Sequence, residues 1–586
     1  MRDMKPCQHT LSDDIVYKEV VVIGNGPSGM VTSFMLAGNV PYLKHIPDDL
    51  PIDDMLKARL QNLPQGVSLL ETDLLSLAEG LEGRSQNPIP LLMDNLLRPC
   101  ADLGLTEDSL IDWRYDMDKE IDHIVLGKGP PGGAWHTFPE GVRTLSPAGW
   151  LTLPPGTAGA KPQAAARVSA RAVAAYCRRY VQQWQLQRYF RSGVVVTGVS
   201  PAPPGLPCCP SCPRAARFLV TGYETSECRV FRYLCRRVVL ACGGGDRPNT
   251  LPLTHTLTNT HTHTQHNMLT HSLADVERAV HQMTNTASDG AVLVVGSGVS
   301  AADAVRLVRA AGLRALHLHR QPNDSLARLP PQTYPDYCQV YKMMLDGPSA
   351  NHENYTPFPE HTIVEITPVT CEEPSLKLKN YTEDESLQPK KVKLLNLVTN
   401  QTVEITVSLI AVLIGSKPDL FFLHTDFNPQ NIEVQDCKCE KKQNQRQCFL
   451  KNHWHYIKSV LEQSIQICKS RYLSTEINGN TDNGCTLPDC NKRKEYSVVN
   501  KQITPYCQCQ PTNPYSSGIG YGVDPNKPVD GRSNPIAIDR STHELLNGPK
   551  GVFALGPLTA DNFIRFIPGG ALAIVAQIHK ENKSDN

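Results

Sequence analysis

The stretch that decides the fold is Glu19-Val20-Val21-Val22-Ile23-Gly24-Asn25-Gly26-Pro27-Ser28-Gly29. An apolar strand pattern runs into a glycine-rich turn, and a helical pattern follows over residues 30–37. In such a unit the first glycine makes the tight turn, the second lets backbone approach a pyrophosphate, and the third packs the helix against the strand. The stretch therefore predicts that Gly24, Gly26 and Gly29 form a phosphate cradle at a helix N-terminus.

A second unit of the same kind lies far along the chain. The apolar run 291–295 leads into Gly296-Ser297-Gly298-Val299-Ser300-Ala301, and a helical pattern follows up to Gly312. One such motif alone fits an ordinary glycine turn equally well, but two in the same context favour two bound dinucleotides. Gly296, Gly298 and Ala301 are the expected second cradle. The fold class that follows is α/β, with two Rossmann-like dinucleotide-binding domains.

The strand after the second cradle helps to choose its nucleotide. Residues 315–319 alternate as a strand and end at Arg320, 24 positions beyond Gly296. A cation at this place accommodates a 2′-phosphate, whereas an acid would repel it. Arg320 therefore favours NADPH over NADH, although a solvated arginine at a strand end is the alternative.

The strand that should follow the first cradle departs from the pattern. It comes late, at residues 122–126, after a stretch of helical and loop character over 46–119, and it ends in Gly127. An Asp or Glu is expected there to hold a ribose hydroxyl. The glycine- and proline-rich turn from Gly127 to Trp135 fits either backbone lying against a ligand or an irregular loop.

The chain ends in a strand pattern, a polar turn and an apolar helix, over residues 552–575. In flavoproteins with two dinucleotides the chain typically returns to the flavin domain at its end, with a helix N-terminus near the flavin ring. Asp561 is the candidate for a ribityl contact. An ordinary acid near a helix N-terminus is the alternative.

Composition narrows the classes of partner. The 586 residues carry 58 basic and 58 acidic side chains, so no net charge favours nucleic acid. No apolar run is long enough to cross a bilayer, and residues 1–15 lack the apolar core of a signal peptide, so we expect a cytoplasmic protein. The odd number of cysteines, 19, favours free thiols. The length predicts two or more packed units.

Two tracts look foreign to a globular fold. Residues 254–270 alternate threonine with histidine, which could suggest metal binding, but translated repeat DNA is the preferred interpretation. The Cys-rich region 425–529 has spacings too short for the usual zinc pairs, which favours a disordered insertion or a retained intron. The Cys209–Cys212 pair lacks a second ligand pair, so we predict no metal site.

Five segments together resemble a known family. They are residues 22–29, 79–88 (Glu-Gly-Leu-Glu-Gly-Arg-Ser-Gln-Asn-Pro), 126–136, 294–298 and 554–557. The chain is similar to the flavin-containing monooxygenase superfamily, and within it to the oxidative stress-induced growth inhibitor family. The resemblance covers residues 15–250, 271–424 and 530–580, and it omits both foreign tracts.

The resemblance implies FAD on the first cradle, NADPH on the second, and transfer of one atom of O2 to a substrate through a flavin hydroperoxide. Gly132, Gly133 and Trp135 match the G-G-x-W segment beside the flavin. Ser146 takes the place of the superfamily's asparagine, and His271 falls near its His-Ser pair. Ser146 and His271 are therefore the two candidate catalytic residues. Hydrogen peroxide is a second expected product, because a hydroxyl is less precisely aimed than an amide.

The expected architecture is of the three-layer ββα type, with a discontinuous FAD domain and an inserted NADPH domain. The FAD domain would comprise residues 15–45, 120–250 and 530–580, and the NADPH domain 271–424. The resemblance also suggests growth control, cytokinesis and the midbody. The substrate, a small molecule or a protein, is not identified.

Two other functions compete with the monooxygenase. One is a regulatory or scaffold protein that keeps the nucleotide-binding fold and binds partner proteins through residues 46–119. The other is a disulfide reductase, which needs a reactive cysteine pair facing the flavin. No suitable pair follows the first cradle or lies in the second domain, so this alternative is disfavoured.

Overall fold

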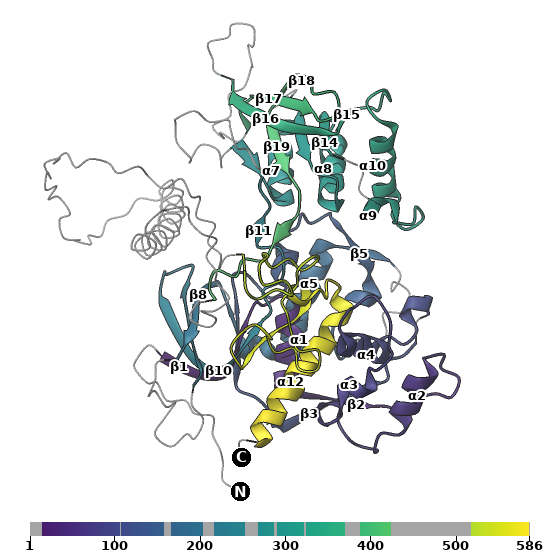
Figure 1. The fold of residues 1–586 in the computed structure, drawn as a ribbon, viewed down its shortest axis with the longest axis vertical. Helices are drawn as coiled ribbons and strands as arrows, with labels where there is room; N and C mark the ends of the chain where they lie inside the picture. The colour runs from purple at the N-terminus through teal and green to yellow at the C-terminus, as the bar shows by residue number, and fades with distance from the viewer. Residues whose placement is uncertain are drawn as a thin grey trace, which may run out of the picture. The chain divides into compact units, whose positions relative to one another are not determined.

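The computed structural model describes residues 15–105, 107–156, 166–202, 216–251, 268–285, 290–320, 324–369, 387–423 and 517–584 (Figure 1). The His/Thr tract up to residue 267, the Cys209–Cys212 pair and the Cys-rich region up to residue 516 lie outside these ranges. Residues 517–529, which the sequence analysis assigned to the Cys-rich region, are part of the described fold. Tyr521 and Val529 are buried there in an apolar cluster with residues of the first sheet.

The first domain is built on a mixed sheet with the strand order β7-β4-β1-β10-β9-β8, in which β21 pairs with the end of β10. Strands β7, β4, β1, β10 and β21 are parallel, whereas β8 and β9 extend the sheet as antiparallel strands. Their bounds are β1 Ile15–Ile23, β4 His123–Gly127, β7 Phe190–Ser192, β8 Val194–Pro201, β9 Phe218–Glu224, β10 Val230–Leu240 and β21 Val552–Ala554.

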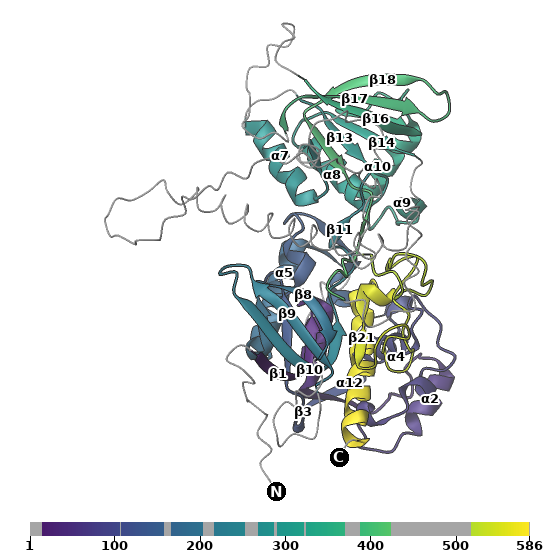
Figure 2. The ribbon, with the colours of Figure 1, turned by 60° about the vertical axis from the view of Figure 1, so that its left-hand side comes forward.

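Three helices pack against this sheet. They are α1 (Pro27–Leu36), α5 (Ala170–Gln183) and α12 (Ile567–Ser584), and α12 shares one apolar core with α1. On α5, the rings of Tyr180 and the following Trp184 lie 6.1 and 5.3 Å from that of Phe34. Tyr180 and Trp184 therefore pack into or against the apolar core of the first domain. Figure 2 shows α12 in yellow beside β21, so the C-terminal segment completes a discontinuous first domain.

Residues between α1 and β4 form more than helices and loops. Helices α2 (Asp54–Gln61), α3 (Leu74–Leu77) and α4 (Pro88–Leu97) are present, as expected. The structure adds an antiparallel ribbon of β2 (Ala37–Leu43) with β3 (Ile111–Glu120), which the sequence analysis did not include. A shorter ribbon, β5 (Arg143–Pro147) with β6 (Arg167–Ser169), follows in the chain.

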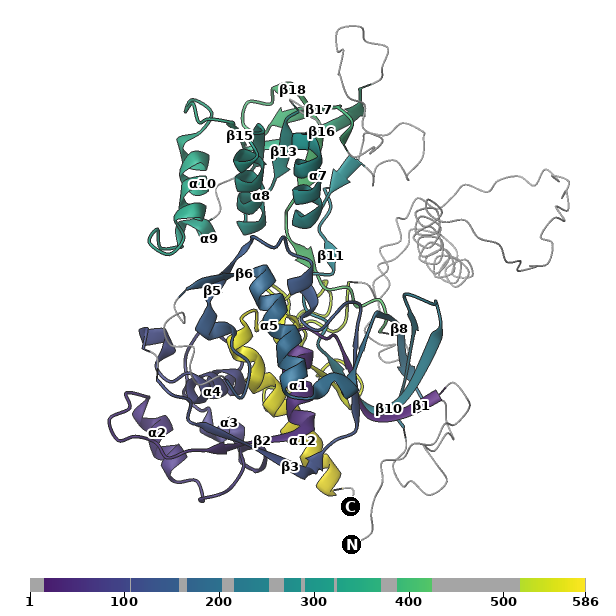
Figure 3. The ribbon, with the colours of Figure 1, turned by 180° about the vertical axis from the view of Figure 1, so that it is seen from behind.

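The second domain has three layers. Its central sheet is parallel, in the order β12-β19-β13-β14-β15. An antiparallel sheet of β16, β17 and β18 packs on one face, and α7, α8 and α10 pack on the other (Figures 2 and 3). The bounds are β12 Leu269–Thr270, α7 Leu273–Asn285, β13 Val292–Val295, α8 Val299–Ala310, β14 Ala315–His319, α9 Asp324–Ala327, α10 Pro335–Asp346, β15 Tyr355–Pro359, β16 His361–Pro368, β17 Lys390–Asn396, β18 Thr402–Val407 and β19 Leu409–Val412. This arrangement is the expected ββα architecture.

The second domain is an insertion in the first. The chain leaves the first sheet after β10 through β11 (Arg247–Pro248), and it returns through β20 (Ser416–Lys417). These two connecting strands pair with each other in antiparallel fashion. Among the described residues, no helix is both long and apolar enough to cross a membrane. The same residues contain no cluster of three or more side chains suited to hold a metal ion.

Candidate dinucleotide sites

The first glycine turn lies where the parallel strands of the first sheet end. The amide of Gly24 donates to the carbonyl of Leu126 at 2.8 Å, which ties the turn to the end of β4. Gly24 has φ +112°, and an ideal Cβ on it would lie 2.2 Å from the carbonyl oxygen of Ala241, just beyond β10. Only glycine fits this position, because the turn is wedged between two neighbouring strands.

The other two glycines of the turn have opposite surroundings. A Cβ on Gly29 would lie 2.0 Å from the carbonyl oxygen of Gly24, so α1 approaches the turn too closely for any side chain there. A Cβ on Gly26 would meet nothing within 4 Å. The open space over Gly26 faces the start of α1, which has no side-chain cap and no acidic residue in its first turn. An anionic pyrophosphate fits this place.

The expected G-G-x-W segment lies on this turn. The amide of Gly132 donates to the carbonyl of Asn25 at 2.9 Å, and a Cβ on Gly133 would lie 3.1 Å from Cα of Gly26. Both glycines have positive φ, +121° and +56° respectively. Trp135 is half-buried against the apolar core of the first domain. The structure thus brings Gly132 and Gly133 to the first cradle, with Trp135 two residues further along the same segment.

The C-terminal segment closes the first site from another side. Gly556 follows β21, and a Cβ on it would lie 2.4 Å from Oγ of Ser28, in the first turn of α1. Asp561 is 2% exposed, and both of its carboxylate oxygens accept hydrogen bonds, one from the Ser85 hydroxyl and one from the Asn87 amide. Burial raises the pKa of Asp561 to about 7, although these two hydrogen bonds act to lower it. The ribityl contact of Asp561 stays a prediction.

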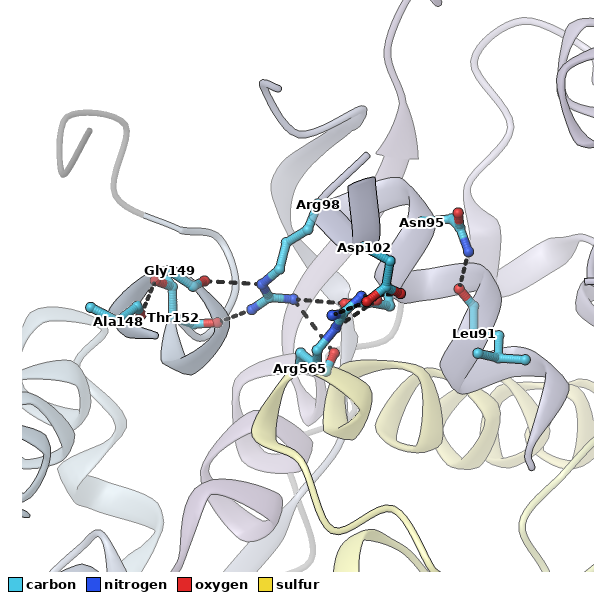
Figure 4. A network of polar contacts seen from close by, with 9 residues as sticks. Leu91, Asn95, Arg98, Asp102, Ala148, Gly149, Thr152 and Arg565 are labelled. Carbon is cyan, nitrogen blue, oxygen red and sulfur yellow. Dashed lines mark hydrogen bonds and ion pairs between the residues drawn. The ribbon is translucent and has the colours of Figure 1, made fainter. Parts of the chain in front are cut away.

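A network of charged groups lies next to this segment (Figure 4). Nε of Arg565 donates to Asp94 at 2.8 Å, and its terminal nitrogens pair with Asp102 at 3.0 Å. Arg98 donates to the carbonyls of Gly149 and Thr152. Because Arg565 and Asp94 are 2% and 5% exposed, this ion pair is held away from water. It joins α4 to the short turn, residues 564–566, that precedes α12.

The second turn repeats the geometry of the first. Gly296 has φ +135°, and a Cβ on it would lie 2.4 Å from the carbonyl oxygen of Leu413, just beyond β19. Ala301 is fully buried, and its Cβ lies 3.4 Å from that position. Gly298 is the N-cap of α8, with no side-chain cap and no acid in the first helical turn. The second turn therefore also offers backbone N–H groups to an anion.

Three polar residues mark the strand beside the second turn. His317 is buried, with Nε2 2.7 Å from the carbonyl of Gly296 and Nδ1 3.0 Å from the hydroxyl of Tyr355. His319 is 2% exposed, and neither ring nitrogen has a hydrogen-bond partner within the described residues. Burial lowers the pKa of His317 to about 3 and that of His319 to about 4, so both rings are neutral at pH 7. Arg320, the predicted nucleotide selector, is exposed at the strand end.

The two candidate catalytic residues lie in different domains. Ser146 is half-buried in β5, where its carbonyl accepts from the Thr144 hydroxyl at 2.7 Å. His271 is half-buried between β12 and α7, with Nδ1 3.3 Å from the carbonyl of Val412. The catalytic roles of Ser146 and His271 stay predictions.

Comparison with known proteins finds relatives that match this chain over almost its full length. No family model matches the sequence. The oxidative stress-induced growth inhibitor 1 of Mus musculus is 31% identical, over 96% of this chain and 95% of that protein. The growth inhibitor 2 of Homo sapiens is 27% identical, over 96% and 94%. The chain belongs to the oxidative stress-induced growth inhibitor family. The expectation from the sequence is confirmed.

Solved structures similar to this growth inhibitor family member are more distant. An ornithine N-hydroxylase from Kutzneria is 10% identical with a TM-score of 0.45, and covers 97% of this chain and all of that one. The bacillithiol disulfide reductase of Bacillus cereus is 12% identical with a TM-score of 0.45, covering 96% and 99%. The strand order and the two glycine turns of this family member define its fold directly.

Sequence reasoning missed several polar residues of the first site in this growth inhibitor family member. Ser85 and Asn87 belong to segment 79–88, which carried the family resemblance but had no assigned role. The structure places both against Asp561, 476 and 474 positions away. Asn25 had no assigned role within the glycine motif, but its side chain donates to the carbonyl of Gly129 at 2.6 Å. Contacts over such distances have no local signal in the sequence.

Proposed function

We propose that this protein is an FAD-dependent monooxygenase that takes reducing equivalents from NADPH and uses O2. The observation that carries the proposal is the first glycine turn. It is packed against backbone at Gly24 and Gly29 but open over Gly26, at the uncapped start of α1. This pattern of close and open positions is what a dinucleotide pyrophosphate requires.

The residues present fit both cofactors. For FAD, the first turn would hold the pyrophosphate, while the segment of Gly132, Gly133 and Trp135, which contacts this turn through its two glycines, would line the flavin end. For NADPH, the uncapped start of α8 would hold the pyrophosphate. The exposed guanidinium of Arg320 would bind the 2′-phosphate as a charge-assisted hydrogen-bond donor.

The chain's own contribution is placement. When bound, FAD supplies the redox chemistry with NADPH and O2. The two helix N-termini hold the phosphates, and the glycines let backbone lie against the cofactors without side chains between them. Ser146 and His271 are the proposed hydrogen-bonding groups near the reacting atoms. Because a serine hydroxyl rotates freely, we propose that part of the O2 leaves as hydrogen peroxide.

The experiment is a test of colour and its reversal. The full-length chain, purified and incubated with FAD, should retain yellow flavin after gel filtration. NADPH should bleach the flavin absorbance without oxygen, and air should restore it with formation of hydrogen peroxide. A colourless, folded protein that ignores FAD would overturn the proposal and favour the regulatory or scaffold function.

The biological setting follows the names of the relatives, which are growth inhibitors induced by oxidative stress. We propose that this protein likewise links oxidant chemistry to growth control. Its substrate, a small molecule or a protein, would then be a component whose oxygenation slows growth or cell division. Cytokinesis and the midbody are the proposed process and place.

A further inference from the structure

The missing acid at the end of β4 has a counterpart in the first glycine turn. An ideal Cβ on Gly127 would lie 2.1 Å from Cγ of Asn25, 2.2 Å from its Nδ2 and 2.4 Å from its Oδ1. The carboxamide of Asn25 therefore fills the volume that the first carbon of an acidic side chain would take. In ordinary dinucleotide folds that side chain binds the hydroxyls of the adenosine ribose.

The Asn25 side chain is fixed in this position. It is 4% exposed, and its Nδ2 donates to the carbonyl of Gly129 at 2.6 Å. Its own carbonyl accepts from the Gly132 amide at 2.9 Å, so backbone and side chain both hold the loop that follows β4. Within the described residues, Oδ1 accepts no hydrogen bond, and it is not among the fully buried side-chain atoms that lack a partner.

We propose that Asn25 replaces the acid that is expected at the end of β4. Its Oδ1 would accept a hydrogen bond from the adenosine ribose of FAD. The inference rests on the proposed FAD site and assigns its ribose contact. An amide oxygen is a hydrogen-bond acceptor, as a carboxylate is, but it carries no charge. The glycine at position 127 is then a requirement of the asparagine at position 25, because the two side chains would occupy one space.

The test measures how well the site recognises ribose hydroxyls. FAD is first bound to the full-length protein. ADP or 2′,3′-dideoxy-ADP is then added to displace it, and the release of FAD is measured by flavin fluorescence to give the affinity of each compound. Wild type should bind ADP roughly three- to ten-fold more tightly than the dideoxy compound, the value of one net hydrogen bond. In Asn25→Ala this preference should vanish. A purely structural role of Asn25 would weaken both compounds equally and leave their ratio unchanged.

A second variant separates recognition from loop anchoring. Asn25→Asp keeps an acceptor for the ribose but removes the donor to Gly129. It should keep the preference for ADP even if the melting temperature falls. If Asn25→Asp loses the preference while wild type has it, Oδ1 is not the acceptor and the inference is overturned.

A reciprocal pair of substitutions tests the shared space. Gly127→Glu alone should lose FAD and stability because its side chain overlaps Asn25. Asn25→Ala with Gly127→Glu should regain FAD binding relative to Gly127→Glu. Additive losses would overturn the inference. If wild type binds FAD but shows no preference between the two ADP compounds, the ribose contact of Asn25 is overturned and the proposed function stands. If wild type binds no FAD, both the ribose contact and the proposed function are overturned.

Discussion

Asn87 and Asp561 lie 474 positions apart in the chain, and the Asn87 side-chain amide donates to the Asp561 carboxylate at 2.9 Å. The same amide donates to the carbonyl of Thr559 at 2.9 Å. Ser85 supplies a second hydrogen bond to the carboxylate. Asn87 is the residue before α4, so this contact joins the start of that helix to the C-terminal segment beside the first cradle.

Asp561→Asn should change how stability depends on pH. The folded-state pKa of Asp561 is raised by burial from 3.8 to about 7, so its contribution to stability is full below pH 3.8 and is lost as the pH rises through 7. The variant lacks this loss. The difference in unfolding free energy, variant minus wild type, should rise by up to about 1.4 kcal/mol per pH unit between pH 4 and 7. Urea unfolding at pH 5 and 8 measures it, and an unchanged difference would contradict the prediction.

Arg565→Leu should destabilise the first domain strongly. It leaves Asp94, which is 5% exposed, without its closest cation. Breaking a buried ion pair costs about 3–5 kcal/mol. Arg84→Leu is the matched control, because Arg84 is 55% exposed and lies 3.5 Å from Asp102, and it should cost less than about 1 kcal/mol. Equal losses in urea unfolding would show that burial of the pair does not matter.

Buried histidines should make the protein sensitive to acid. Burial lowers the pKa of His123 from 6.5 to about 3 and that of His543 to about 4. These histidines bind protons more readily in the unfolded chain than in the folded protein. The stability that comes from keeping them neutral is therefore full above pH 6.5 and is lost as the pH falls towards 4. His123→Gln should flatten the decline in unfolding free energy over that range. His281→Gln, at an exposed position, is the control and should follow wild type.

Arg320→Ala should weaken NADPH binding about ten- to a hundred-fold, the value of charge-assisted hydrogen bonds to one phosphate. NADH binding should hardly change. Arg314→Ala is the matched control, because Arg314 is an exposed arginine just before the other end of β14. Calorimetric titration with both nucleotides measures the two affinities. Equal losses for NADPH and NADH would show that Arg320 does not select the 2′-phosphate.

Gly26→Ala should remove FAD without unfolding the protein. The added methyl group meets no protein atom within 4 Å, so it enters only the space that we propose for the pyrophosphate. The melting temperature without cofactor should stay near that of wild type, while bound flavin falls. Gly141→Ala, also with nothing within 4 Å but in an exposed loop, should change neither quantity. Retained flavin in Gly26→Ala would place the cofactor elsewhere.

The parts of the fold that the sequence predicted are those with local signals. Strand, glycine turn and helix follow one another without a break at both cradles, over residues 15–36 and 292–310, so β1 with α1 and β13 with α8 were expected. The ribbon of β2 with β3 was not, because Ile111–Glu120 is rich in charged residues and its partner strand contains Gly38 and Pro41. Such a strand forms through tertiary pairing rather than through its own pattern.

The candidate site divides in the same way. Gly24, Gly26 and Gly29 were assigned from spacing alone, because their role depends on neighbours within one turn. The role of Asn25 can be seen only once Gly127 is known to lie against it. The surroundings of Asp561 can be seen only once Ser85 and Asn87 are known to contact it. Those partners become neighbours only when the strands of the first sheet are aligned, so composition and periodicity could not have identified them.

The late position of β21 and α12 has a consequence for biosynthesis. A ribosome that has already made β1, α1, β4 and β10 holds a sheet that lacks β21 and an apolar core that lacks α12. The nascent chain must wait through the whole second domain before residues 552–584 arrive. A premature stop codon upstream of residue 552 would thus leave the first domain incomplete, although most of that domain is encoded near the start of the gene. Truncation alleles should behave as complete losses and present exposed apolar surface to chaperones.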